Sequence, residues 1–122
     1  MNSTIKIICG ETEVTGRLNE SGTAGMIETI LPVTGTVNLW GDEIYFTIPL
    51  KTGPENARDT VSLGDIAYWP EGNALCLFLG KTPISTATEI KPISPVNIVG
   101  HLDNIEVLLS TVTPGDKIVI RR

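Results

Sequence analysis

Short runs of alternating apolar and polar residues, separated by turn-forming residues, recur along the chain. In the clearest run, Ile44, Phe46 and Ile48 alternate with Tyr45 and Thr47, which is the two-residue period of a strand with one buried face. Isoleucine, valine and threonine (15, 9 and 15 residues) make up 39 of the 122 residues, and their branched side chains favour sheet. We therefore expect an all-β domain, a barrel or a sandwich. The expected strands are Thr4–Cys9, Glu13–Leu18, Thr36–Trp40, Glu43–Leu50, Asp65–Trp69, Ala74–Leu79, Val96–Leu102 and Lys117–Arg121.

Three segments depart from the plain alternating pattern. Ala74–Leu79 is apolar on both faces, which predicts the most buried strand of the chain. Thr23–Leu31 carries apolar residues at helical spacing and is followed by a proline, and Asn104–Ser110 has room for one or two turns, so we expect two short helices. Pro83–Pro95 holds three prolines and little periodicity, which predicts a long loop, and such loops are often functional.

Composition and charge indicate one domain over residues 1–122 and exclude some classes of partner. The net charge is −5 and the nine basic residues are scattered, so we expect no nucleic-acid partner. We see neither a signal-peptide pattern nor an apolar stretch near the roughly 20 residues of a membrane helix, so we expect a cytoplasmic protein and no membrane partner. Cys9 and Cys76 lie in apolar runs and are expected to be buried, reduced thiols; a disulfide between them is the alternative.

One block of the chain is more specific than these patterns. Gly64–Gly80, with Pro54–Ala57 before it and Val96–Leu102 after it, resembles the signature of a prokaryotic cyclophilin-like domain family of unknown function. The resemblance covers nearly the whole chain. It implies a closed antiparallel barrel of about eight strands with one or two short helices at its ends.

The cyclophilins themselves are peptidyl-prolyl isomerases, and the resemblance raises that activity for this chain. Their catalysis uses an arginine in a strand whose nearest match here is Tyr45-Phe46-Thr47-Ile48-Pro49, with Thr47 approximately at the arginine's place. A neutral hydroxyl cannot replace a planar, charged guanidinium group, so no catalytic residue is assigned. Tyr45, Phe46 and Thr47 are kept as candidate binding residues.

The richest polar and aromatic cluster is formed by Tyr68, Trp69, Pro70, Glu71 and Asn73. Tyrosine and tryptophan offer large rigid faces with one polar group, a surface suited to small ligands or peptides. Because ligands often bind at the mouths of barrels, we predict a binding site there. The alternative is that Trp69 plugs the end of the barrel while the following residues form a turn.

Three polar residues elsewhere join the candidate site. Glu55 and Asn56 lie in a loop that could face the aromatic cluster across the barrel mouth; the alternative is that they are solvated or cap a turn. His101 is the only histidine, and its alternative role is a strand-end residue with local hydrogen bonds. With one histidine, no metal-binding spacing and no phosphate-binding glycine loop, we expect no metal and no cofactor.

Three hypotheses of function follow. The first is a binding module that holds a small molecule or an extended peptide at the barrel mouth. The second is a weak or divergent peptidyl-prolyl isomerase, which rests on the resemblance alone. The third is a structural or interaction protein, for which pairing with a second copy of the chain stays open.

Overall fold

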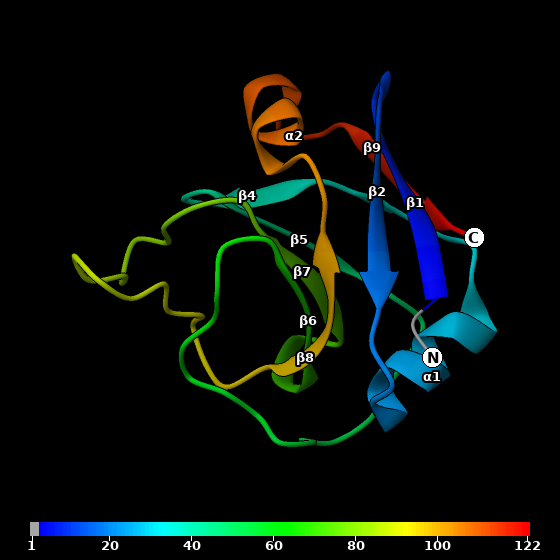
Figure 1. Cartoon of the computed structure of the whole chain (residues 1–122), viewed down its shortest axis with the longest axis horizontal. Helices are drawn as coiled ribbons and strands as arrows, with labels where there is room; N and C mark the ends of the chain where they lie inside the picture. Colours follow the sequence, from blue (N-terminus) through cyan, green and yellow to red (C-terminus); the bar gives the residue numbers. More distant parts are fainter. Residues whose placement is uncertain (1–2) are drawn as a thin grey trace.

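The computed structural model describes residues 3–122 and shows a nearly closed antiparallel barrel with two helices (Figure 1). Within these residues the sheet has nine strands, one more than predicted. The strands are β1 (Ser3–Cys9), β2 (Thr12–Leu18), β3 (Val33–Thr36), β4 (Asn38–Trp40), β5 (Glu43–Thr47), β6 (Asp65–Trp69), β7 (Ala74–Phe78), β8 (Asn97–Leu102) and β9 (Lys117–Arg121). The remaining elements are α1 (Gly22–Ile30), α2 (Ile105–Thr111) and the single 3-10 turn η1 (Pro70–Gly72).

The order of the strands explains the near closure of the barrel. They follow one another as β3-β9-β1-β2-β8-β6-β7-β5-β4, so β3 and β4 form the two ends of the sheet. Only Val37 separates β3 from β4 along the chain, which brings the two ends together. Gly35 of β3 packs directly against the ring of Phe46 on β5, and no larger residue would fit there. The sheet therefore curls round until its edge strand β3 packs against β5, near the opposite edge.

The extra strand comes from a segment that the sequence pattern did not resolve. A single strand was predicted over Thr36–Trp40, but the chain turns a corner at Val37 and splits this segment between β3 and β4. The backbone N–H of Val37 donates to the Asp116 carbonyl, and the Val37 carbonyl accepts from the Gly115 N–H. Val37 is therefore bonded to the turn before β9 and not to a neighbouring strand. β3 is stabilised by pairing with β9, far away in the sequence.

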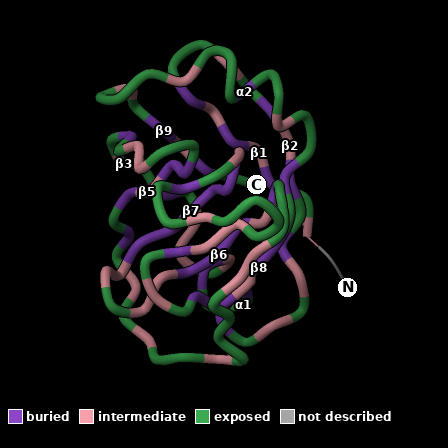
Figure 2. Tube along the Cα trace, turned by 90° about the vertical axis from the view of Figure 1, so that its left-hand side faces the viewer, coloured by how far each residue is buried: buried purple, intermediate pink, exposed green. Residues whose placement is uncertain are grey.

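The interior of the barrel is filled by one set of alternating side chains. Ile44 and Phe46 of β5 point into this core, together with Leu75 and Leu77 of β7. The residues of β7 that alternate with these pack into a second, smaller cluster on the outside of the wall, formed by Ala67, Cys76, Phe78 and Val96. All five residues of β7 are thus buried, which confirms the prediction for this run. Figure 2 shows buried residues along the strands and exposed ones along the loops.

The helices lie at opposite ends of the barrel in Figure 1. Ser21 caps α1 by accepting a hydrogen bond from the Ala24 N–H (3.2 Å), and the helix ends before Pro32, within one residue of each predicted boundary. Helix α2 likewise lies one residue further along the chain than predicted. Neither helix of the described residues has the length and apolar character needed to cross a membrane.

The long loop predicted over Pro83–Pro95 runs from residue 79 to 96, between β7 and β8, and lies outside the barrel wall. It has internal structure despite its lack of regular elements. Ser85 Oγ accepts hydrogen bonds from the N–H groups of Thr82 (2.9 Å) and Lys91 (3.0 Å). An isolated bridge between Val61 and Ile90 joins it to the 48–64 segment. Together these segments cover the outer apolar cluster.

Candidate functional site

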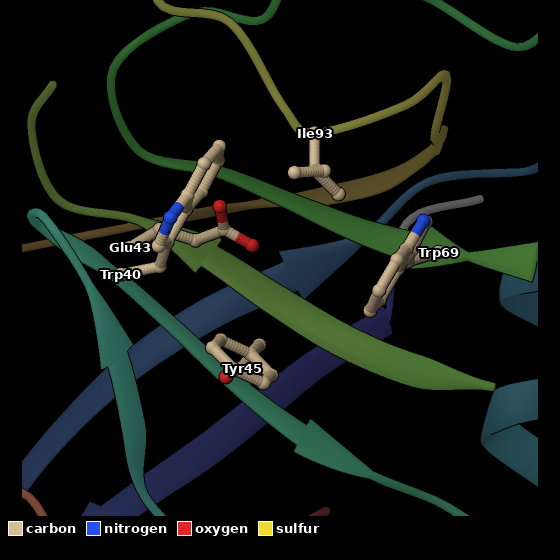
Figure 3. Close-up of a pocket in the computed structure, with 5 residues that line it drawn as sticks. All are labelled: Trp40, Glu43, Tyr45, Trp69 and Ile93. Carbon is tan, nitrogen blue, oxygen red and sulfur yellow. The ribbon is translucent and has the colours of Figure 1, made fainter. Parts of the chain in front are cut away.

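A hollow walled by aromatic side chains lies on the outer wall of the barrel. Glu43 and Tyr45 face it because they alternate along β5 with residues that point into the core. The opposite wall comes from the end of β6, and the 79–96 loop supplies an isoleucine. The cavity between the side chains has a volume of about 170 Å³ and is open to solvent. We call this hollow the outer pocket; it is lined by Trp40, Glu43, Tyr45, Trp69 and Ile93 (Figure 3).

The Glu43 carboxyl group lies between the rings of Trp40 and Trp69, with Ile93 on one side and Tyr45 on the other (Figure 3). The residue is only 5% exposed, although it can carry a charge. Its Oε1 atom is buried and has no hydrogen-bond partner within residues 3–122. Buried polar atoms nearly always have a partner in folded proteins, so this oxygen calls for an explanation, and a bound molecule is one.

The surroundings of Glu43 also change its acidity. Burial raises the pKa of its carboxyl group from an ordinary 4.5 to about 7, and a hydrogen bond from the Cys76 thiol lowers it by a smaller amount. Burial, with the carboxyl group of Glu43 next to it, in turn raises the pKa of Cys76. Both cysteines are free and buried, as the sequence predicted. A carboxyl group of this kind can be neutral or charged near pH 7.

Trp69 is held in a fixed orientation at the wall of the outer pocket. Its indole Nε1–H donates to Ser94 Oγ at 2.6 Å, which ties β6 to the long loop. Behind the ring lies Gly72, where any Cβ atom would overlap the indole. The wall is therefore built before any ligand arrives, which reduces the entropy lost on binding.

The other members of the predicted aromatic cluster lie elsewhere. Tyr68 is fully buried inside the barrel, where its hydroxyl donates to the Leu50 carbonyl at 2.7 Å. Pro70, Glu71 and Asn73 form the turn between β6 and β7, with Asn73 in the left-handed conformation (φ 50°). The cluster thus divides between the core, a turn and the outer wall.

Two further candidates on the predicted binding strand also lie outside the outer pocket. Phe46 is part of the barrel core, next to Gly35. Thr47, at the place that the resemblance gives to the isomerase arginine, is an exposed residue at the end of β5. No arginine lines the outer pocket.

Glu55 forms a structural network that the sequence did not reveal. Its carboxylate accepts hydrogen bonds from the N–H groups of Gly22 (2.9 Å) and Thr23 (2.8 Å) and from the Thr23 hydroxyl (2.6 Å), at the start of α1. These bonds, the Thr23 hydroxyl first, lower the pKa of Glu55. The buried Asn97 side chain accepts from the Glu55 N–H (2.9 Å) and donates to the Gly53 carbonyl (3.0 Å). The network fixes the 53–55 segment and the helix to β8.

His101 lines one further hollow, and Glu55 and Asn56 line a second; the two hollows share Asn19, Asp65 and Ile98. His101 lies between Arg17 of β2 and Asp65 of β6 in the sheet register, and its Nδ1 atom is 3.7 Å from Asp65 Oδ1. Its side chain is 58% exposed. Asn56 has a left-handed backbone (φ 48°) and is exposed. These residues and the outer pocket are separate surfaces.

The structure thus brings Tyr45 and Trp69 together and adds Trp40, Glu43 and Ile93, which the sequence did not assign to a site. Glu43 is one of several acidic residues near turns, and only its place on the Tyr45 face of β5 marked it out. This hollow lies on the outer wall of the barrel, whereas the sequence predicts a site at the barrel mouth.

Comparison with known proteins agrees with this architecture. A family model described as Cyclophilin-like matches residues 3–121. The chain belongs to the cyclophilin-like family. No match to a curated protein was found.

Two solved structures resemble this cyclophilin-like chain. The solution structure of the hypothetical protein AF2241 from Archaeoglobus fulgidus is 39% identical, with a TM-score of 0.82 over 99% of this chain and 95% of that one. The structure of McbB in complex with tryptophan is 17% identical, with a TM-score of 0.72 over 97% of this chain. The chain spans 44% of the length of McbB, and the likeness to McbB shows a shared fold.

Proposed function

We propose that this cyclophilin-like protein binds a small molecule with a flat apolar group in the outer pocket. The observation that carries the proposal is the buried Glu43 Oε1 atom, which has no partner within residues 3–122 and lies in a hollow walled by three aromatic side chains. The aromatic rings would contact the flat group, and the carboxyl oxygen would accept a hydrogen bond from it.

The shape of the outer pocket favours a small molecule over an extended peptide. Its volume of about 170 Å³ is close to that of an engineered apolar cavity of about 150 Å³ that holds benzene, so it has room for one small ring and too little for an extended peptide. Its walls are mostly apolar, with one polar group that can orient the ligand, which is the usual composition of such sites. McbB, which has the same fold, was solved with tryptophan bound, and this supports the choice of a flat ring by analogy.

The two tryptophans of the chain make the proposal directly testable. Trp40 and Trp69 are the only tryptophans, and both line the outer pocket, so intrinsic tryptophan fluorescence reports on that hollow alone. Small phenyl compounds, whose rings do not absorb where tryptophan is excited, serve as probes. We expect them to change the emission in a saturable manner.

Backbone amide NMR on the same samples places the binding site. We expect the largest shift changes at residues of the outer pocket, such as Tyr45 and Ile93. Changes confined to the hollows around Arg17 and His101, or no saturable change with any probe, would refute the proposed function. Ile84→Ala, at an exposed residue of the same loop that does not line the outer pocket, should leave probe binding unchanged.

A further inference from the structure

The unpartnered oxygen in the outer pocket defines what a ligand must bring. Glu43 is 5% exposed and its Oε1 atom has no hydrogen-bond partner within residues 3–122. An ionised carboxylate only accepts hydrogen bonds, so the missing group is a donor. Ile93, which is 57% exposed, lies above the carboxyl group in Figure 3, on a side of the outer pocket that solvent reaches.

The charge of Glu43 is also unbalanced. Within residues 3–122 no lysine, arginine or histidine forms an ion pair with it. The titratable groups that face it are the Cys76 thiol of β7 and Tyr45 of its own strand, while β4 and the long loop contribute Trp40 and Ile93, which do not titrate. A buried carboxylate without a cationic partner is unfavourable, and a bound cation removes that penalty.

The aromatic walls select the same kind of group. The faces of tryptophan and tyrosine rings attract cations, and the attraction is strongest where water is excluded. Trp40 and Trp69 lie on either side of the Glu43 carboxyl group in Figure 3. The hydrogen bond from Trp69 to Ser94 holds one of these rings in place. A cation beside the carboxylate would therefore lie near aromatic faces at the same time.

We propose that the ligand of the outer pocket is a protonated amine attached to a flat apolar group. This inference rests on the proposed function and adds the chemical class of the ligand. An anionic ligand would meet the Glu43 carboxylate at close range and be repelled. A hard metal ion is disfavoured because Glu43 is the only acidic residue that lines the outer pocket, and such ions need several oxygen ligands.

Binding of an amine is coupled to a proton on Glu43. The charged amine pairs with the carboxylate, so any proton that the carboxyl group holds in the free protein passes to solvent when the ligand binds. Burial raises the pKa of this group to about 7, so acid should weaken binding over the range where other glutamates have already lost their protons. The amine keeps its own proton throughout.

Three probes of similar size separate the classes of ligand: 2-phenylethylamine, the neutral 2-phenylethanol and the anionic 3-phenylpropionate. Tryptophan fluorescence measures the dissociation constant of each. At about pH 8 we expect the amine to bind at least about tenfold more tightly than the alcohol, with the acid weaker still. The affinity for the amine should fall about 30-fold between about pH 8 and about pH 5.5 as the carboxyl group takes up its proton.

Glu43→Gln keeps the shape of the side chain and removes its charge. We expect this variant to bind the amine and the alcohol within about threefold of each other and to lose the pH dependence. Glu13→Gln, the same change at an exposed residue of β2, should behave as the unmodified protein. Since the pH series uses the unmodified protein, the test does not depend on the folding of a variant.

The outcomes separate this inference from the proposed function. If no probe binds, or binding is mapped away from the outer pocket, both are overturned. If the alcohol binds as tightly as the amine at about pH 8, or the preference persists in Glu43→Gln, the outer pocket is a ligand site but the inferred amine is wrong.

Discussion

Replacing Glu43 with glutamine should change how the stability of this protein depends on pH. Burial raises the pKa of this carboxyl group from 4.5 to about 7, so the folded protein holds the proton more tightly than the unfolded chain does. The stability that this gives is complete below pH 4.5 and is lost as the pH rises through about 7. A change of this size in pKa corresponds to about 3 kcal/mol of unfolding free energy.

Urea unfolding followed by far-UV circular dichroism measures this contribution at several values between about pH 4 and about pH 8. Other carboxyl groups titrate equally in both proteins, so the difference between Glu43→Gln and the unmodified protein isolates the one residue. As the pH rises across this range, we expect the free energy of unfolding of Glu43→Gln to increase by about 3 kcal/mol relative to that of the unmodified protein. Glu13→Gln, exposed on β2, should show no such gain. If the free energies of unfolding of Glu43→Gln and the unmodified protein change with pH in parallel, Glu43 is not a buried, unpaired carboxyl group.

Three further substitutions test other parts of the structure. Gly72→Ala places a methyl group against the Trp69 ring, so we expect it to shift the tryptophan emission, weaken probe binding and cost about 1–3 kcal/mol in urea unfolding. Glu55→Gln removes the charged acceptor at the start of α1. Because the pKa of Glu55 is lowered in the fold, its contribution to the free energy of unfolding is present above pH 4.5 and is lost as the pH falls below that value. In acid unfolding monitored by circular dichroism, the stability of the variant should therefore depend less on pH than that of the unmodified protein. Tyr68→Phe leaves a backbone carbonyl without its donor and should cost about 1–3 kcal/mol in the same urea assay, with probe affinity unchanged because this ring lies inside the barrel.

Each of these predictions has a result that would count against it. Gly25→Ala adds a methyl group in open space on α1, so it should leave the emission unchanged; an equal effect of both glycine substitutions would contradict the packing argument. If the stability of Glu55→Gln depends on pH as that of the unmodified protein does, Glu55 does not stabilise the start of α1. Loss of probe affinity in Tyr68→Phe would place that residue at the ligand site.

Much of the fold follows from short-range signals in the sequence. Asp65–Trp69 and Lys117–Arg121 were predicted with the boundaries that the structure has, because each is a short apolar run that begins directly after a turn signal. No strand was predicted over Val33–Gly35, the greater part of β3. That strand depends on its pairing with β9, about 80 residues away, and no local pattern reports such a partner.

The candidate site was harder to predict, because it combines residues from separate elements. Tyr68 and Trp69 are adjacent in sequence and were assigned to one cluster, yet neighbouring residues of a strand point to opposite faces, so the barrel wall divides them. Glu55 was a candidate to face the ligand, with a solvated loop residue as the alternative; its carboxylate accepts hydrogen bonds at the start of α1, a contact that only the fold creates. Trp40 and Ile93 reach the outer pocket through the β4–β5 turn and the long loop, whose paths the sequence pattern does not give.

Carbon-13 NMR of glutamate side-chain carboxyl groups shows directly whether Glu43 is a buried carboxyl group that pairs with an amine. Each carboxyl signal is followed as the pH is raised, first in the free protein and then with 2-phenylethylamine, and Glu43→Gln assigns the signal of interest. We expect the Glu43 signal to titrate with a midpoint of about 7 and the amine to move that midpoint to lower pH. A midpoint near 4.5, or one that saturating amine leaves unchanged, would contradict this expectation.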